Sequence, residues 1–229
     1  MSGITVSRRS DALLAIKVGL GDDADRRRRE ADLLARIDHP GVVQLIDVVD
    51  PDTDDPGADG PVEIHLAYVG TDTWRSSPPT TSASLIEGLA VVASTVVDLH
   101  DLGIAHRALL AEHIVLGADR RPVICGLADA TARADDVDAL GRLITTLAVG
   151  AVPEVRADLD AIASRAGSGE LSAHQLTTEL NRLRAPAARG TVGGREGSAP
   201  ACRRPRRRGA PCCRGAAERR IRVVRNRCR

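Results

Sequence analysis

Short alternating runs of apolar and polar residues open the chain, and longer stretches of helical spacing follow them. The apolar runs Ile4–Val6 and Leu13–Val18 flank a polar turn, which predicts two paired strands. From Asp22 to Ile37 the apolar residues recur at helical spacing, and the acidic start suits a helix N-terminus. Val62–Val69 alternates and then becomes continuously apolar, as a strand does. The first part of the chain therefore predicts a small sheet with one helix.

The rest of the chain is predicted to be mainly helical, with one hairpin. Ser84–His100 carries an apolar helical stripe with Ser84 as the expected N-cap, and two closing helices are expected at Val155–Ala166 and Ser172–Leu183. Between them, Ile114–Leu116 and Pro122–Ile124 are short strand-like runs around a polar turn. Together these patterns predict an α+β fold.

Two charged residues stand out against this apolar pattern. Lys17 is the only lysine in the chain and ends an apolar strand, while Glu30 shares a helical stripe with Leu34 and Ile37, which puts a carboxylate on the inward face. Taken separately, Lys17 is an ordinary solvated residue at a strand edge and Glu30 an ordinary flank of an amphipathic stripe.

The stretch Gly103–Asp129 reads as loop, strand, turn and strand, and it resembles the catalytic core of a protein kinase. In that family H-R-D-L-x-x-x-N leads into a hairpin that ends at D-F-G, and a V-A-I-K strand, similar to Leu14-Ala15-Ile16-Lys17, carries a phosphate-contacting lysine. The resemblance covers about Ile4 to Leu183. It implies a bilobal fold like that of bacterial serine/threonine kinases. A truncated N-lobe at 1–69 lacks the Gly-rich loop and its first strand, and a mainly helical C-lobe follows at 70–186.

The positions that carry kinase chemistry have lost it in this sequence. Ala108 stands where the family has its catalytic Asp, His113 where it has the metal-binding Asn, and Ile124 where it has the Asp of D-F-G. Alanine cannot accept a proton, isoleucine cannot bind a metal, and Mg²⁺ prefers oxygen to imidazole. About a dozen residues separate Ile124 from Asp136, too few for an activation segment. The resemblance therefore implies a pseudokinase that does not use Mg²⁺.

Binding and scaffold positions are retained. The resemblance assigns Lys17 and Glu30 to the phosphate-contacting ion pair and the backbone of Ala67 to Val69 to the adenine-binding hinge, so it implies weak, metal-free ATP binding. Structural roles fall on Leu34, His106, Arg107, Gly126 and Asp136, the last matching the Asp that holds the H-R-D backbone.

Two carboxylates lie near the lost positions without replacing them. Asp129 falls beyond Gly126, and Glu112 is one residue away from the metal-binding position. An active serine/threonine kinase of unusual chemistry remains an alternative, supported by Lys17 and Glu30. A truncated gene remnant is another.

The composition changes sharply after Pro186. Residues 187–229 hold fourteen Arg and two Glu, about +12, so the remainder carries about −11 for a net charge of +1. Such a tail lacks the apolar surface to fold and is expected to be disordered. It could attach the protein to nucleic acid or anionic lipid, or it could be an out-of-register translation of GC-rich DNA. A partner protein is expected for the kinase-like part.

Other compositional features narrow the class of protein. Phe is absent, with one Trp and one Tyr, so the core must be aliphatic. The five Cys form no C-x-x-C pair, which argues against a zinc site. With no signal sequence and no apolar run of about 18 to 20 residues, we expect a cytoplasmic protein without a transmembrane segment.

Overall fold

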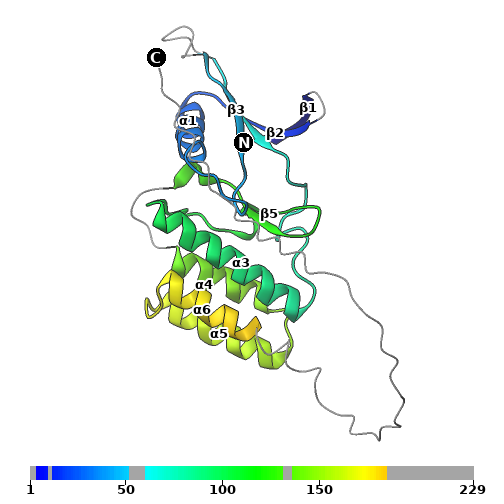
Figure 1. Ribbon diagram of the computed structural model, residues 1–229, viewed down its shortest axis with the longest axis vertical. Coiled ribbons are helices and arrows are strands. Elements are labelled where there is room, and N and C mark those ends of the chain that lie inside the picture. The colour runs from blue at the N-terminus through cyan, green and yellow to red at the C-terminus, as the bar shows by residue number, and fades with distance from the viewer. Residues whose placement is uncertain (1–3, 10–11, 52–59, 131–135, 185–229) are drawn as a thin grey trace, which may run out of the picture. The chain divides into compact units, whose positions relative to one another are not determined.

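The computed structural model describes residues 4–9, 12–51, 60–130 and 136–184. These residues form a mixed α+β fold of two small antiparallel sheets and five α-helices (Figure 1). The predicted α+β class is confirmed. The Arg-rich tail on which the nucleic-acid and lipid predictions rest lies outside the described residues.

The larger sheet has four strands in the order β1-β2-β4-β3. Its strands are β1 (Ile4–Arg9), β2 (Ala12–Gly19), β3 (Leu45–Val49) and β4 (Val62–Ala67), and all neighbouring pairs are antiparallel. The predicted strands around the first turn are confirmed. The register places Lys17 of β2 opposite Ile64 of β4, in the interior of the sheet.

Helix α1 (Asp22–Leu34) packs against this sheet and buries a polar as well as an apolar face. Its buried residues are Ala24, Arg27, Glu30, Ala31 and Leu34. The helix ends three residues before the predicted Ile37, which instead closes a tight turn through a hydrogen bond from its N–H to the carbonyl of Leu34. Glu30 and Leu34 lie one turn apart, as the stripe predicted.

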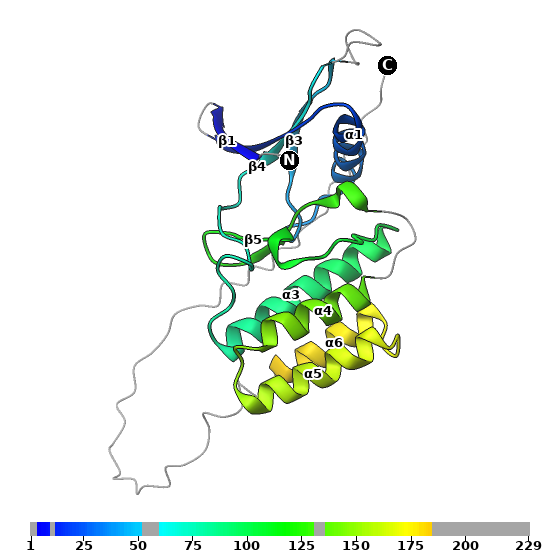
Figure 2. The same cartoon turned by 180° about the vertical axis from the view of Figure 1, so that it is seen from behind.

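The longest of the described helices is α3 (Ser82–Asp101), coloured green in Figures 1 and 2. Its N-cap is Thr81, and the predicted cap at Ser84 is wrong. Thr81 and Ser84 form a capping box, because the Thr81 hydroxyl accepts from the Ser84 N–H and the Ser84 hydroxyl accepts from the Thr81 N–H. Ser84 therefore lies in the first turn of the helix.

The predicted hairpin is confirmed at its predicted bounds. Strands β5 (Ile114–Leu116) and β6 (Pro122–Ile124) pair antiparallel and form the second sheet. Single bridges attach this hairpin to other segments, from Val42 to Ile124 and from Thr73 to Val115. Short 3-10 turns, η1 (Ala111–His113) and η2 (Leu127–Asp129), precede and follow it.

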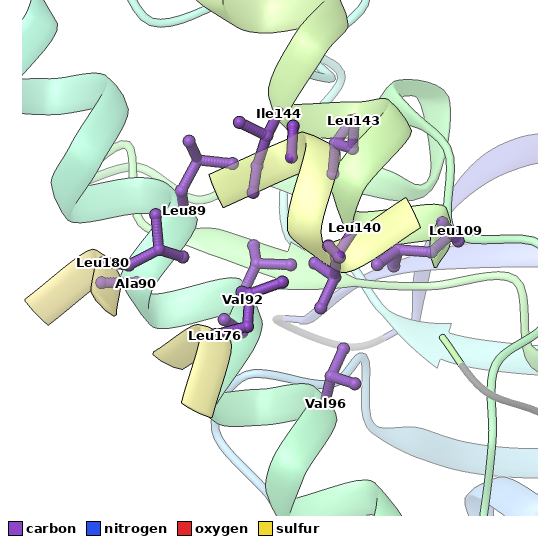
Figure 3. Packing of buried hydrophobic residues seen from close by; sticks show 14 of the residues in the cluster. Leu89, Ala90, Val92, Val96, Leu109, Leu140, Leu143, Ile144, Leu176 and Leu180 are labelled. Atoms are coloured by element: carbon purple, nitrogen blue, oxygen red, sulfur yellow. The ribbon is translucent and has the colours of Figure 1, made fainter. Parts of the chain in front are cut away.

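Three further helices complete the fold and enclose the larger core. They are α4 (Val137–Ala148), α5 (Pro153–Gly167) and α6 (Ala173–Arg184). The predicted closing helices are confirmed, and Ser172 caps α6 by accepting from the Gln175 N–H at 3.3 Å. Figure 3 shows the packing, in which aliphatic side chains from α3, α4 and α6 meet. The labelled residues are Leu89, Ala90, Val92, Val96, Leu109, Leu140, Leu143, Ile144, Leu176 and Leu180.

Among the described helices, α3 alone is long and apolar enough to cross a membrane. In the structure 61% of its most apolar window is buried, and it packs against α4 and α6. Core packing therefore accounts for its composition.

Candidate functional site

A buried ionic network joins the sheet to α1. Nζ of Lys17 lies 2.6 Å from Oε1 of Glu30, and the two residues are only 8% and 0% exposed. Strand β2 points Lys17 toward α1, and the inward stripe of the helix presents Glu30 to it. The structure thus brings together the two residues that the sequence predicts as a pair.

Arg27 is a third member of this network, and sequence reasoning missed it. Its Nη1 lies 2.6 Å from Oε2 of Glu30, so one carboxylate is shared between two cations. The sequence does contain a signal for this contact, because Arg27 and Glu30 are three residues apart on one helix and such residues lie side by side. Gly19 at the end of β2 makes room for this arrangement, since a Cβ there would lie 2.7 Å from Cγ of Arg27.

Asp136 organises the backbone of the loop that follows α3. Its carboxylate is fully buried and accepts hydrogen bonds from the N–H groups of His106 and Arg107, each at 2.7 Å. The ring of His100 adds a third bond, from Nε2 to Oδ2 at 3.0 Å. Arg107 has the left-handed φ of 65° in this turn, while its side chain is exposed. The two backbone contacts are those that the resemblance assigned to Asp136. The hydrogen bond between His100 and Asp136 was not predicted from the sequence.

Two histidine rings lie close together, His106 at a position to which the resemblance gives a structural role and His113 at that of the metal-binding Asn. His106 is fully buried and bonds through Nε2 to the carbonyl of Cys125 at 2.9 Å. The His113 ring lies 5.6 Å from it and bonds through Nδ1 to the carbonyl of Ala108 at 2.5 Å. Gly126, at φ 84°, lies against His113, since a Cβ there would lie 3.0 Å from the ring. His113 is thus a packed, hydrogen-bonded part of the loop.

His106 is held in its neutral form. Burial lowers the pKa of His106, and the nearby His113 acts in the same direction, while the bond to Cys125 and the charge of Asp136 oppose them. Its Nδ1 is buried without a hydrogen-bond partner among the described residues, so a proton there would be unpaired.

Ile124, the last residue of β6, and Cys125, which follows it, lie in different surroundings. Ile124 is buried in the aliphatic core with α3. By contrast, Lys17 and Glu30 both act electrostatically on the Cys125 thiol, whose pKa is raised mainly by burial. The predicted degenerate position at Ile124 is therefore occupied by an apolar core side chain.

The two hinge residues border a different space. Ala67 and Val69 line a cavity of about 320 Å³ with residues 37–40, residues 42–44 and Val123, and neither Lys17 nor Glu30 lines it. The N–H of Ala67 donates to Gln44 and that of Tyr68 to Leu13. The N–H of Val69 makes no backbone bond to another described residue.

The neighbouring carboxylates are already paired. Asp129 holds Arg26 through both oxygens at 3.0 and 2.9 Å, and Glu112 lies 3.6 Å from Arg75. Within the ranges that the structure describes, no three His, Cys, Asp or Glu side chains gather as a metal site would require. Mg²⁺ takes carboxylate and carbonyl oxygen, and the two carboxylates named here each have an arginine partner.

Leu34 completes the residues singled out by sequence. It is buried in the smaller core, which also contains Ile64 and Leu66 and against which Cys125 packs.

The chain matches no protein-family model, and no curated protein is significantly similar to it.

Proposed function

We propose that the chain is a bilobal, kinase-like regulatory module that binds a nucleotide through Lys17 and does not transfer its phosphate. The observation that carries this proposal is the buried Lys17 ammonium, which bonds one carboxylate oxygen. A partner protein and a cytoplasmic location belong to the same proposal.

The number of N–H donors on the Lys17 ammonium supports a ligand with acceptor oxygens. An ammonium has three N–H donors, and Glu30 takes one of them in the described contacts. A buried charge is stable only when its hydrogen-bonding capacity is satisfied, so the remaining donors favour an incoming acceptor such as phosphate oxygen.

Loss of phosphoryl transfer is supported by the side chains near this network. Transfer needs divalent metal to neutralise the phosphates and a carboxylate to position the attacking hydroxyl. Ala108 offers a methyl group, His113 is bonded to the backbone, and Ile124 is an apolar residue buried in the core. None of these is a carboxylate, which is why we favour binding over catalysis.

Thermal-shift and calorimetric titration of the full chain with adenine nucleotides tests this function. We expect a shift that does not need Mg²⁺ and that is lost in Lys17→Ala, with Arg29→Ala as an exposed, positively charged control. Absence of binding by every nucleotide would rule out the proposal. Phosphate transfer to a protein substrate, dependent on Lys17, would instead establish the alternative of an active kinase.

A further inference from the structure

We infer that the cavity between the β5–β6 turn and α3 binds a small zwitterion with an apolar side chain, either a free α-amino acid or a dipeptide. The cavity has a volume of about 590 Å³, within the range of small-molecule sites in proteins. Neither Lys17 nor Glu30 lines it, so this ligand is separate from the proposed nucleotide.

The buried residues that line the cavity are apolar. They come from the segment before α3, from α3 itself and from the hairpin, and they are Trp74, Gly88, Leu116 and Pro122. A ligand side chain that covers them removes apolar surface from water, which favours binding in proportion to the area covered. These residues therefore select a ligand with an apolar group.

Four charged residues line the same cavity, and two of them already have local partners. Arg120 on the turn donates from Nη2 to the Ser77 hydroxyl at 3.0 Å, which ties the turn to the segment before α3. Asp119 accepts from the backbone N–H of Arg121 at 3.0 Å, which fixes the turn itself. Both contacts hold the wall of the cavity in place.

The other two charges are free and come from different walls. The Arg121 guanidinium on the turn and the Glu87 carboxylate on α3 make no hydrogen bond or ion pair with any other residue that the structure describes. No ion pair joins them to each other, although both line the cavity. A guanidinium binds a carboxylate well, and a carboxylate binds an ammonium.

The balance of charge favours a ligand that carries both groups. The lining residues contribute two positive and two negative charges, so a zwitterion keeps the cavity neutral and gives Arg121 and Glu87 a partner each. A purely anionic ligand would bring its charge toward Glu87 and Asp119, and a purely cationic one toward both arginines. Like charges brought together in this way oppose binding.

Calorimetry of the full chain with leucine, dileucine, N-acetylleucine and leucinamide tests the inference. We expect a zwitterion to bind, and the tighter of leucine and dileucine identifies the source of the ligand. N-acetylleucine lacks the ammonium and leucinamide the carboxylate, so each should bind about fivefold more weakly than the tighter zwitterion, the factor typical of one solvent-accessible ion pair. Glycine should also bind more weakly, because it leaves the apolar residues uncovered. Failure of both zwitterions to bind, or equal binding by either single-charge analogue, overturns the inference.

Two substitutions at exposed residues examine the charges separately. Arg121→Gln should weaken binding of the tighter zwitterion about fivefold and leave leucinamide unchanged, because leucinamide has no carboxylate to lose a partner. Glu87→Gln should weaken the same zwitterion and leave N-acetylleucine unchanged. Arg29→Gln, an exposed change on α1 outside the cavity, should alter none of these affinities. A variant that weakens the zwitterion and its matched analogue equally contradicts the assigned ion pair.

Discussion

At the scale of single residues, a buried carboxylate does the most to fix local structure. Asp136 accepts three hydrogen bonds, two of them from consecutive backbone N–H groups. In Asp136→Asn an NH₂ group replaces one carboxylate oxygen, so a side-chain donor would face a backbone N–H donor. We therefore expect a loss of about 2 to 4 kcal/mol in the free energy of unfolding. Urea denaturation measures this. Asp138→Asn, at an exposed residue paired with Arg142, should cost less than about 0.5 kcal/mol. Equal costs for the two would contradict this role for Asp136.

His106 makes stability depend on pH. Burial lowers its pKa in the folded state, so below the ordinary unfolded value of about 6.5 the unfolded chain binds a proton that the folded chain does not. Its contribution is therefore complete above that pH and is lost as the pH falls toward the lowered pKa. We expect the free energy of unfolding to drop between about pH 7 and pH 5 more steeply than in His106→Gln. If the free energy of unfolding fell equally with pH in the unchanged protein and in His106→Gln, a group other than His106 would cause the pH dependence.

At the scale of elements, the start of α3 depends on one short-range motif. Thr81 and Ser84 satisfy each other's N–H groups in the capping box. Thr81→Ala should lower the free energy of unfolding by about 1 kcal/mol, whereas Thr80→Ala, one residue outside the motif, should leave it nearly unchanged. Thermal unfolding followed by circular dichroism compares the two. A larger loss in Thr80→Ala would mean that the helix is not held at this end by its cap.

Elements were more predictable than the contacts between them. Periodicity gave β5, β6, α5 and α6 nearly at their observed bounds, because each pattern is local. The end of α1 and the cap of α3 were misplaced, since a turn and a capping pair compete with the apolar stripe at those points. The Lys17–Glu30 contact could be anticipated through a resemblance, but the hydrogen bond between His100 and Asp136 depends on tertiary placement that no spacing encodes.

At the scale of the whole molecule, the described fold has its own core. Both hydrophobic clusters, and the helices that cover them, lie within residues 14–184. We therefore expect deletion of residues 187–229 to change the free energy of unfolding by less than about 0.5 kcal/mol. Chemical denaturation of the full chain and of the chain without residues 187–229 measures this difference. A strongly destabilised short form would mean that the Arg-rich segment contributes to folding.

The single tryptophan provides an optical reporter of this core. Trp74 is only 2% exposed, and its ring lies against Gly88 of α3 so closely that a Cβ at that glycine would be 2.9 Å away. An indole in such surroundings fluoresces at short wavelength, free of interference from any other tryptophan. Its emission should shift to the red as soon as the segment before α3 separates from the helix.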